Sequence, residues 1–104
     1  MDTTGKKVIL LVEDDKALNR AAVFKVGQQG HRIISTMRAE DALSILKENH
    51  AIIDVVWLDI LLPGMSGLEF LAEMQKYDDY KNIKVVICSV SEKGGLLKDI
   101  IGKF

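Results

Sequence analysis

Short, continuous runs of hydrophobic residues recur along the chain, and such runs are typical of strands buried on both faces of a parallel sheet. They lie at Val8–Val12, His31–Thr36, Ile52–Leu58 and Ile83–Cys88. Stretches in which hydrophobic residues have helical spacing separate these runs. Strands that alternate with helices predict right-handed crossovers and one parallel sheet covered on both faces. The pattern therefore predicts a single α/β domain over residues 1–104, in which residues 1–6 are a polar lead-in.

Three helices are predicted between these strands from hydrophobic residues that recur every three or four positions. The stripes are Leu18, Ala21, Ala22 and Val26, then Ala39, Ala42, Leu43 and Leu46, and then Leu68, Leu71 and Ala72. Ser66 and Glu69 have the spacing of a capping box and predict the start of the third helix. Glu40 and Asp41 interact favourably with the dipole of the second helix, and we expect no further role for them.

The last part of the chain, residues 90–104, is less regular. Leu97, Ile100, Ile101 and Phe104 predict an amphipathic helix. Only residues 90–95 separate this helix from the fourth strand, whereas a crossover to another parallel strand takes about a dozen residues or more. We therefore expect four parallel strands and an atypical C-terminal end. The fourth strand would then be an exposed edge through which two chains could form a dimer.

The composition excludes several functional classes. Hydrophobic residues make up 48% of the chain and charged residues 28%, which is ordinary for a globular protein. The net charge of -1, without a basic stripe, argues against direct binding of nucleic acid. No hydrophobic run approaches the roughly 20 residues of a membrane span. The single cysteine, Cys88, excludes an internal disulfide and fits a reducing compartment, so we expect a cytoplasmic protein.

Acidic and hydroxyl side chains follow three of the predicted strands. Glu13 and Asp14 follow the first strand, Asp59 the third and Ser89 the fourth. The carboxyl ends of parallel strands share one edge, and neighbouring strands are roughly 5 Å apart, so the three carboxylates would converge. A single acid at a strand end is usually solvated or caps a helix, but this set is hard to assign to chance. A divalent cation would remove the repulsion, and Mg2+ suits a site with few carboxylates and a phosphate ligand.

Such a site would suit phosphoryl transfer. An aspartate that faces Mg2+ is a competent nucleophile toward a phosphoryl group, and Asp59 would then form an aspartyl phosphate. The hydroxyl of Ser89 could donate a hydrogen bond to an oxygen of the bound group.

Four segments of the chain resemble the receiver domain of bacterial two-component response regulators. They are Val12-Glu13-Asp14-Asp15, Asp54-Val55-Val56-Trp57-Leu58-Asp59, Pro63-Gly64-Met65-Ser66-Gly67 and Val85-Val86-Ile87-Cys88-Ser89. The resemblance implies a flavodoxin-like three-layer αβα sandwich with strand order 2-1-3-4, from which the family's usual fifth strand is missing. It also implies a phospho-acceptor signalling domain and not an enzyme. Its partners would be a sensor histidine kinase or phosphotransfer protein and a downstream protein target or output domain.

The same resemblance implies roles for individual residues. Asp59 would be the phospho-acceptor, and Asp14 and Asp59 would bind Mg2+ directly. Glu13 would hold a water molecule on the metal, and the backbone carbonyl of Leu61 would be a further ligand. Ser89 would bind a phosphoryl oxygen and move toward it on activation.

The family's phosphate-binding lysine has no clear counterpart. Lys103 superficially resembles it, but this residue ends a helical pattern. A pseudo-receiver, an interaction module that is never phosphorylated, is therefore an alternative. A Mg2+-dependent phosphohydrolase of the haloacid dehalogenase type is a weaker one, because Leu61 stands where that family has a second aspartate.

The remaining distinctive side chains are expected to have structural roles. Trp57 and Cys88 lie in buried strands and are predicted to pack in the core, where Trp57 could report metal binding by its fluorescence. His31 and His50 flank the predicted elements without a partner that suggests catalysis, so both are expected to be solvated.

Overall fold

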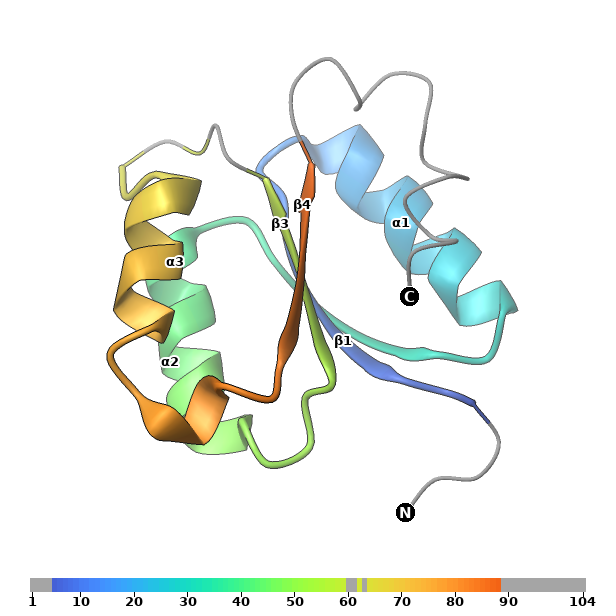
Figure 1. Cartoon of the computed structure of the whole chain (residues 1–104). Helices are drawn as coiled ribbons and strands as arrows, with labels where there is room; N and C mark the ends of the chain where they lie inside the picture. The colour runs from blue at the N-terminus through green and yellow to red at the C-terminus, as the bar shows by residue number, and fades with distance from the viewer. Residues whose placement is uncertain (1–4, 60–61, 63, 89–104) are drawn as a thin grey trace.

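The computed structural model describes residues 5–59, 62 and 64–88, which form a parallel sheet with helices on both faces (Figure 1). The elements in chain order are β1 (Val8–Val12), α1 (Lys16–Gln28), β2 (Arg32–Thr36), α2 (Ala39–Asn49), β3 (Val55–Asp59), α3 (Gly67–Met74), the 3-10 helix η1 (Asp78–Tyr80) and β4 (Lys84–Cys88). The strand order is β2-β1-β3-β4, and each neighbouring pair is parallel. The predicted fold class and strand order are confirmed.

The central strand β1 is buried on both faces because its side chains alternate between two layers of helix. Ile9 and Leu11 pack with Val26 of α1, whereas Leu10 and Val12 pack with residues of α2 and α3. Figure 1 shows α1 on one side of the sheet and α2 and α3 on the other. This arrangement explains why the sequence of β1 is a continuous hydrophobic run and not an alternating one.

Helices α1 and α2 bury most of the residues that their periodicity predicts. Ala22 and Val26 of α1 are buried, as are Ala39, Ala42 and Leu46 of α2. The other members of the two predicted stripes, Leu18, Ala21 and Leu43, are half-buried. Both helices therefore cover the sheet with the expected faces.

Strand β3 begins three residues later than the sequence predicts. The predicted first residue, Ile52, is 46% exposed, and its amide donates to the carbonyl of Asn49 in the turn after α2. Asp54 then closes the start of the strand, because its amide donates to Val8 O over 2.9 Å and its Oδ2 accepts from Val8 N over 2.8 Å. Every residue of Val55–Asp59 is buried.

Helix α3 begins at the predicted capping box. The Oγ atom of Ser66 accepts a hydrogen bond from Glu69 N over 3.1 Å, and Glu69 Oε1 accepts from Ser66 N over 3.5 Å. Two backbone donors of the first turn are thereby satisfied.

The predicted buried face of α3 is wrong. Phe70 and Met74 are buried, whereas Leu68 is 62% exposed, Leu71 is half-buried and Ala72 is exposed. Five of the eight residues of this helix are hydrophobic, so spacing alone could not identify the face that packs.

The two histidines are less solvated than predicted. His31 is half-buried, and its Nδ1 atom accepts a hydrogen bond from Lys7 N over 2.9 Å. Burial, together with the charges of Lys6 and Lys7, lowers the pKa of His31. His50 is also half-buried, and its ring centroid lies 5.5 Å from that of Tyr80.

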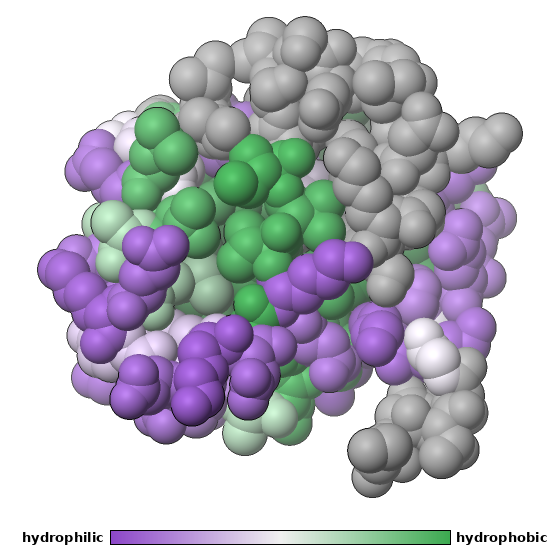
Figure 2. All heavy atoms as spheres, viewed as in Figure 1, coloured by the Kyte–Doolittle hydropathy of each residue, from purple (hydrophilic) through white to green (hydrophobic). Residues whose placement is uncertain are grey.

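Hydrophobic side chains gather over α3 and β4 on the face of the molecule in Figure 2. A groove of about 290 Å³ lies between α3, η1 and β4, and Leu71, Tyr77 and Val85 contribute to its lining. The described residues therefore leave part of this side of the sheet open. In the described part of the chain, no helix has the length and hydrophobicity to cross a membrane.

Several predictions concern residues outside the described ranges. Leu61, Ser89 and Lys103 are among them, as are residues 90–104 with their predicted helix. The missing fifth strand, the atypical C-terminal end and the edge-paired dimer therefore stay predictions. The packing of the Cys88 side chain also stays a prediction, whereas Trp57 is 5% exposed and lies in the core as predicted.

Candidate functional site

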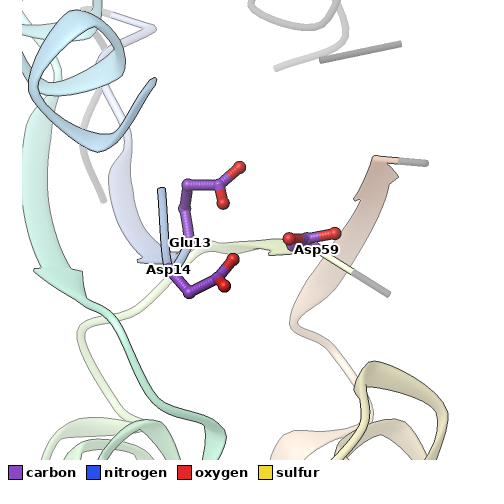
Figure 3. Close-up of side chains that lie close together, drawn as sticks. All are labelled: Glu13, Asp14 and Asp59. Carbon is purple, nitrogen blue, oxygen red and sulfur yellow. The ribbon is translucent and has the colours of Figure 1, made fainter. Parts of the chain in front are cut away.

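Two neighbouring strands bring the predicted acidic residues together at one edge of the sheet. Glu13 and Asp14 directly follow β1, and Asp59 is the last residue of β3. The register that pairs Val12 with Leu58 puts Glu13 beside Asp59. Figure 3 shows the three side chains gathered where the two strands end. This is the carboxyl edge, where open α/β sheets bind their ligands.

The three carboxylates are close enough to share one cation. One oxygen from each of Glu13, Asp14 and Asp59 lies within 4.8 Å of the other two. Glu13 is 5% exposed and Asp59 is 1% exposed, whereas Asp14 is half-buried. Buried charges are normally paired or coordinate a metal, because removing them from water is costly. The cluster therefore differs from the solvated acids that are common on protein surfaces.

The size and chemistry of the cluster fit Mg2+. This ion binds oxygen ligands at about 2.1 Å in an octahedron, so ligands on opposite sides of it are about 4.2 Å apart. The observed spread of 4.8 Å needs only small side-chain movements to reach that geometry. Mg2+ also keeps several water ligands, which leaves positions for the oxygens of a phosphate group.

The turn after β1 is held from three directions. Glu13 N donates to Thr36 O of β2 over 3.0 Å, and Asn19 Nδ2 of α1 donates to Glu13 O over 3.1 Å. Asp15 N donates to Glu13 Oε2 over 3.0 Å, while Asp15 Oδ1 caps α1 by accepting from Leu18 N. These hydrogen bonds fix the backbone of the turn that carries the side chains of Glu13 and Asp14.

The predicted convergence of the described carboxylates is observed, whereas their roles stay predictions. Glu13, Asp14 and Asp59 come together as predicted, and the other candidate residues lie outside the described ranges. Thr36 and Asn19 were not predicted to take part. Thr36 ends a strand at the same edge, and this position was the available signal for its role.

A parallel sheet in the order 2-1-3-4, with an acidic cluster at its carboxyl edge, defines a doubly wound domain of the flavodoxin-like class. The family model of the response regulator receiver domain matches residues 9–101. The chain belongs to this family and is a signalling domain of two-component systems.

Curated relatives agree with this assignment. The response regulator Rcp1 of Synechocystis is 37% identical over 97 residues, which cover 86% of this chain and 66% of Rcp1. The transcriptional regulatory protein AfsQ1 of Streptomyces coelicolor is 36% identical over 70 residues, or 67% of this chain and 30% of AfsQ1. The sensor kinase CckA of Brucella abortus is 30% identical over 88 residues, or 85% of this chain and 9% of CckA. The chain therefore spans less than a third of the length of AfsQ1 and less than a tenth of the length of CckA.

Solved structures share the fold. The Mn(2+)-bound form of Rcp1 matches with a TM-score of 0.75 and 28% identity, covering 93% of this chain and 88% of that one. The response regulator TrrA of Thermotoga maritima, in complex with Mg(2+)-BeF, matches with a TM-score of 0.72 and 27% identity. That match covers 90% of this chain and 80% of TrrA.

Proposed function

We propose that this receiver domain is a phosphorylation switch in which Asp59 accepts a phosphoryl group in a Mg2+-dependent reaction. The observation that carries the proposal is the convergence of three carboxylate oxygens within 4.8 Å at the carboxyl edge of the sheet. The Mn(2+)-bound form of Rcp1 and the complex of TrrA with Mg(2+)-BeF support the same function.

The ligand roles in this proposal are those that the resemblance to receiver domains implies. Asp14 and Asp59 would bind Mg2+ directly, and the backbone carbonyl of Leu61 would be a further ligand. Glu13 would act through a metal-bound water, and the hydrogen bond from Asp15 N to its Oε2 atom would help to orient its carboxylate. When bound, Mg2+ would neutralise the carboxylates and the negative charge of the incoming phosphoryl group.

In the transfer step, one carboxylate oxygen of Asp59 attacks the phosphorus atom of the donor. An oxygen–phosphorus bond forms, and the bond between phosphorus and the donor breaks, with its electron pair leaving on the donor. The carboxylate already carries the attacking lone pair, so no general base is required. In this proposal Ser89 binds a phosphoryl oxygen, and Lys103 is the candidate for the phosphate-binding lysine.

The donor in this proposal is a sensor histidine kinase or a phosphotransfer protein, with which receiver domains interact. Phosphorylation would shift a two-state equilibrium and change a protein-binding face, which acts on a downstream protein or an output domain. The similarity to part of a sensor kinase and part of a transcriptional regulatory protein supports both kinds of partner. A cytoplasmic location, which the single cysteine supports, belongs to the same proposal.

The proposal is tested by the intact mass of the chain after incubation with acetyl phosphate and Mg2+. The wild-type chain should gain the mass of one phosphoryl group, and EDTA should prevent the gain. Asp59→Asn should gain none, while Asp41→Asn, which removes an exposed acid outside the site, should behave as wild type.

Two results would contradict the proposal. A folded chain that binds Mg2+ but gains no phosphoryl group would be a pseudo-receiver that acts only as an interaction module. Release of many phosphate ions per chain, without an adduct, would indicate a phosphohydrolase.

A further inference from the structure

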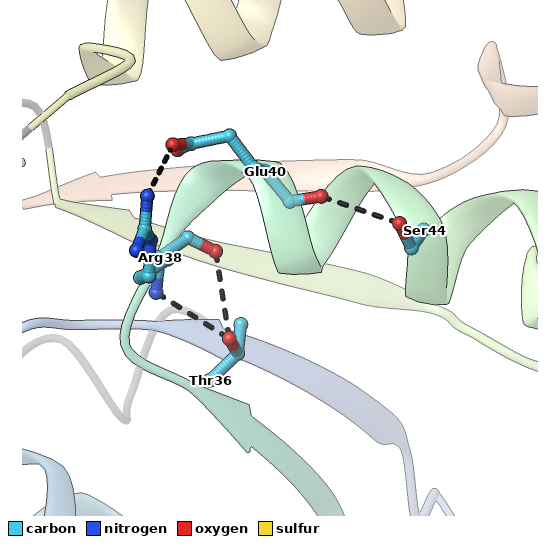
Figure 4. A network of polar contacts seen from close by, with 4 residues as sticks. All are labelled: Thr36, Arg38, Glu40 and Ser44. Carbon is cyan, nitrogen blue, oxygen red and sulfur yellow. Dashed lines mark hydrogen bonds and ion pairs between the residues drawn. The ribbon is translucent and has the colours of Figure 1, made fainter.

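A polar network at the start of α2 begins at the end of β2 (Figure 4). The hydroxyl of Thr36 donates to Arg38 O and accepts from Arg38 N, both over 3.4 Å. Arg38 Nη2 in turn lies 2.9 Å from Glu40 Oε2. Ser44 Oγ donates to the carbonyl of Glu40 one turn later, over 3.5 Å. The side chain of Glu40 is therefore held by Arg38, whose backbone is in turn bonded to the end of β2.

Through this side chain the network reaches the loop between β3 and α3. A Cβ atom at Gly64 would lie 3.2 Å from Glu40 Oε2 and 3.7 Å from Oε1, so the carboxylate lies against the backbone of the loop. Gly64 has a φ angle of +74°, a conformation that favours glycine. The pKa of Glu40 is lowered, chiefly by Arg38 and also by the backbone amides of Glu40 and Met65, so this side chain is a carboxylate at neutral pH.

One oxygen of this carboxylate is incompletely satisfied. Oε1 is buried and accepts no hydrogen bond of normal geometry from the residues that the structure describes. A buried oxygen without a hydrogen bond is costly, so the position of this carboxylate calls for an explanation.

Resting on the proposed function, we propose that Glu40 is a positioning residue for the Mg2+ and phosphoryl site. Gly64 belongs to the segment that joins Asp59, at the end of β3, to the capping box of α3 at Ser66. Glu40 lies against this segment at Gly64. It would thereby restrain the chain that follows Asp59 relative to the acidic cluster. Mg2+ demands near-ideal octahedral geometry, so a displaced loop would weaken its binding.

Calorimetric titration of the full chain with Mg2+ tests this role. Glu40→Ala should raise the dissociation constant about tenfold, the lower end of the effect of residues that orient metal ligands. Glu40→Gln should fall between Glu40→Ala and wild type, because its amide oxygen can still accept a hydrogen bond from Arg38. The matched control is Asp41→Ala, which removes an exposed acid from the same helical turn and should bind Mg2+ as wild type does.

A second readout separates positioning from folding. Acyl-phosphate formation in Glu40→Ala should approach the wild-type rate at saturating Mg2+, while the urea midpoint of Glu40→Gln stays near that of Asp41→Ala. Gly64→Ala should also weaken Mg2+ binding, because its methyl group would press on Glu40 Oε2. The double variant Glu40→Ala/Gly64→Ala should then lose less binding free energy for Mg2+ than the sum of the losses in the two single variants.

The two proposals fail in different ways. If the wild-type chain binds Mg2+ and is phosphorylated, but Glu40→Ala binds Mg2+ as tightly as Asp41→Ala, only the role of Glu40 is overturned. Additive effects of Glu40→Ala and Gly64→Ala would likewise overturn it. If the wild-type chain does not bind Mg2+, the proposed function itself is wrong.

Discussion

Asp59 combines burial with the nearness of two other acids. Its carboxylate is 1% exposed, and one of its oxygens lies within 4.8 Å of an oxygen of Glu13 and of an oxygen of Asp14. Carboxylates this close repel one another when all are ionised, and a divalent cation among them would remove that repulsion. The placement of Asp59 therefore supports its proposed role in binding Mg2+ and accepting a phosphoryl group.

His31 makes a second residue-scale prediction, because its pKa is lowered in the folded chain. The ordinary pKa of this histidine, which it has in the unfolded chain, is 6.5. As the pH falls below this value, the unfolded chain takes up a proton more readily than the folded chain. The stability that neutral His31 contributes is therefore present above this pH and is lost as the pH falls through the folded pKa.

The measurement is the urea midpoint of unfolding between neutral pH and about pH 5. His31→Asn offers Lys7 N an acceptor that does not titrate, so its midpoint should fall less than that of wild type. His50→Asn, which keeps His31, should follow the wild-type curve. Equal losses in wild type and His31→Asn would show that another group is responsible.

The residue contacts that the sequence did not reveal join distant segments. Glu40 was expected only to interact with its helix dipole, yet it contacts Gly64. His31 was expected to be solvated, yet it accepts from the amide of Lys7. Each contact joins residues 24 positions apart, as the residue numbers show. Hydrophobic periodicity reports which face of an element is buried, but it carries no information about such polar pairs.

At the scale of elements, the sequence predicted the strands better than the short helix. β1 matches its hydrophobic run at both ends, because a strand buried on two faces leaves a continuous signal. β3 starts late because Asp54 uses both its amide and its carboxylate to bond to Val8. In α3, hydrophobic residues occur on several sides, so packing against the rest of the fold decides which of them are buried.

The corrected face of α3 gives an element-scale prediction. Phe70→Ala should lower the free energy of unfolding by about 3–5 kcal/mol, because it removes a fully buried aromatic ring. Leu68→Ala should change it by no more than about 0.5 kcal/mol, because Leu68 is 62% exposed. Urea denaturation of both variants measures the difference. If Leu68→Ala lowered the free energy of unfolding more than Phe70→Ala, the buried face of α3 would be the one predicted from the sequence.

At the scale of the whole molecule, topology assembles the site. The strand order brings β1 and β3 side by side, so residues 45 positions apart, Asp14 and Asp59, meet at one edge. The sequence could predict this meeting because all parallel strands end at the same edge. In the described residues β4 pairs with β3 alone, and the edge-paired dimer stays a prediction that light scattering can test.

Mg2+ should stabilise the whole fold, because the unfolded chain does not hold the three carboxylates together. At a Mg2+ concentration about 100 times the dissociation constant, the free energy of unfolding should rise by about 2.7 kcal/mol. Urea midpoints in Mg2+ and in EDTA measure this gain. Asp59→Asn should lose most of it, and Asp41→Asn should keep it. A wild-type midpoint that is the same in both solutions would argue against metal binding.

The central claim is that Asp59 itself carries the phosphoryl group, and chemical mapping of the modified residue tests it most directly. After incubation with acetyl phosphate and Mg2+, borohydride reduces an aspartyl phosphate to homoserine and releases phosphate. Tandem mass spectrometry then identifies the converted residue. We predict homoserine at position 59 alone, and none when EDTA is present. Conversion at Asp14, reduction at Glu13, or an unmodified Asp59 in a chain that binds Mg2+ would contradict the account.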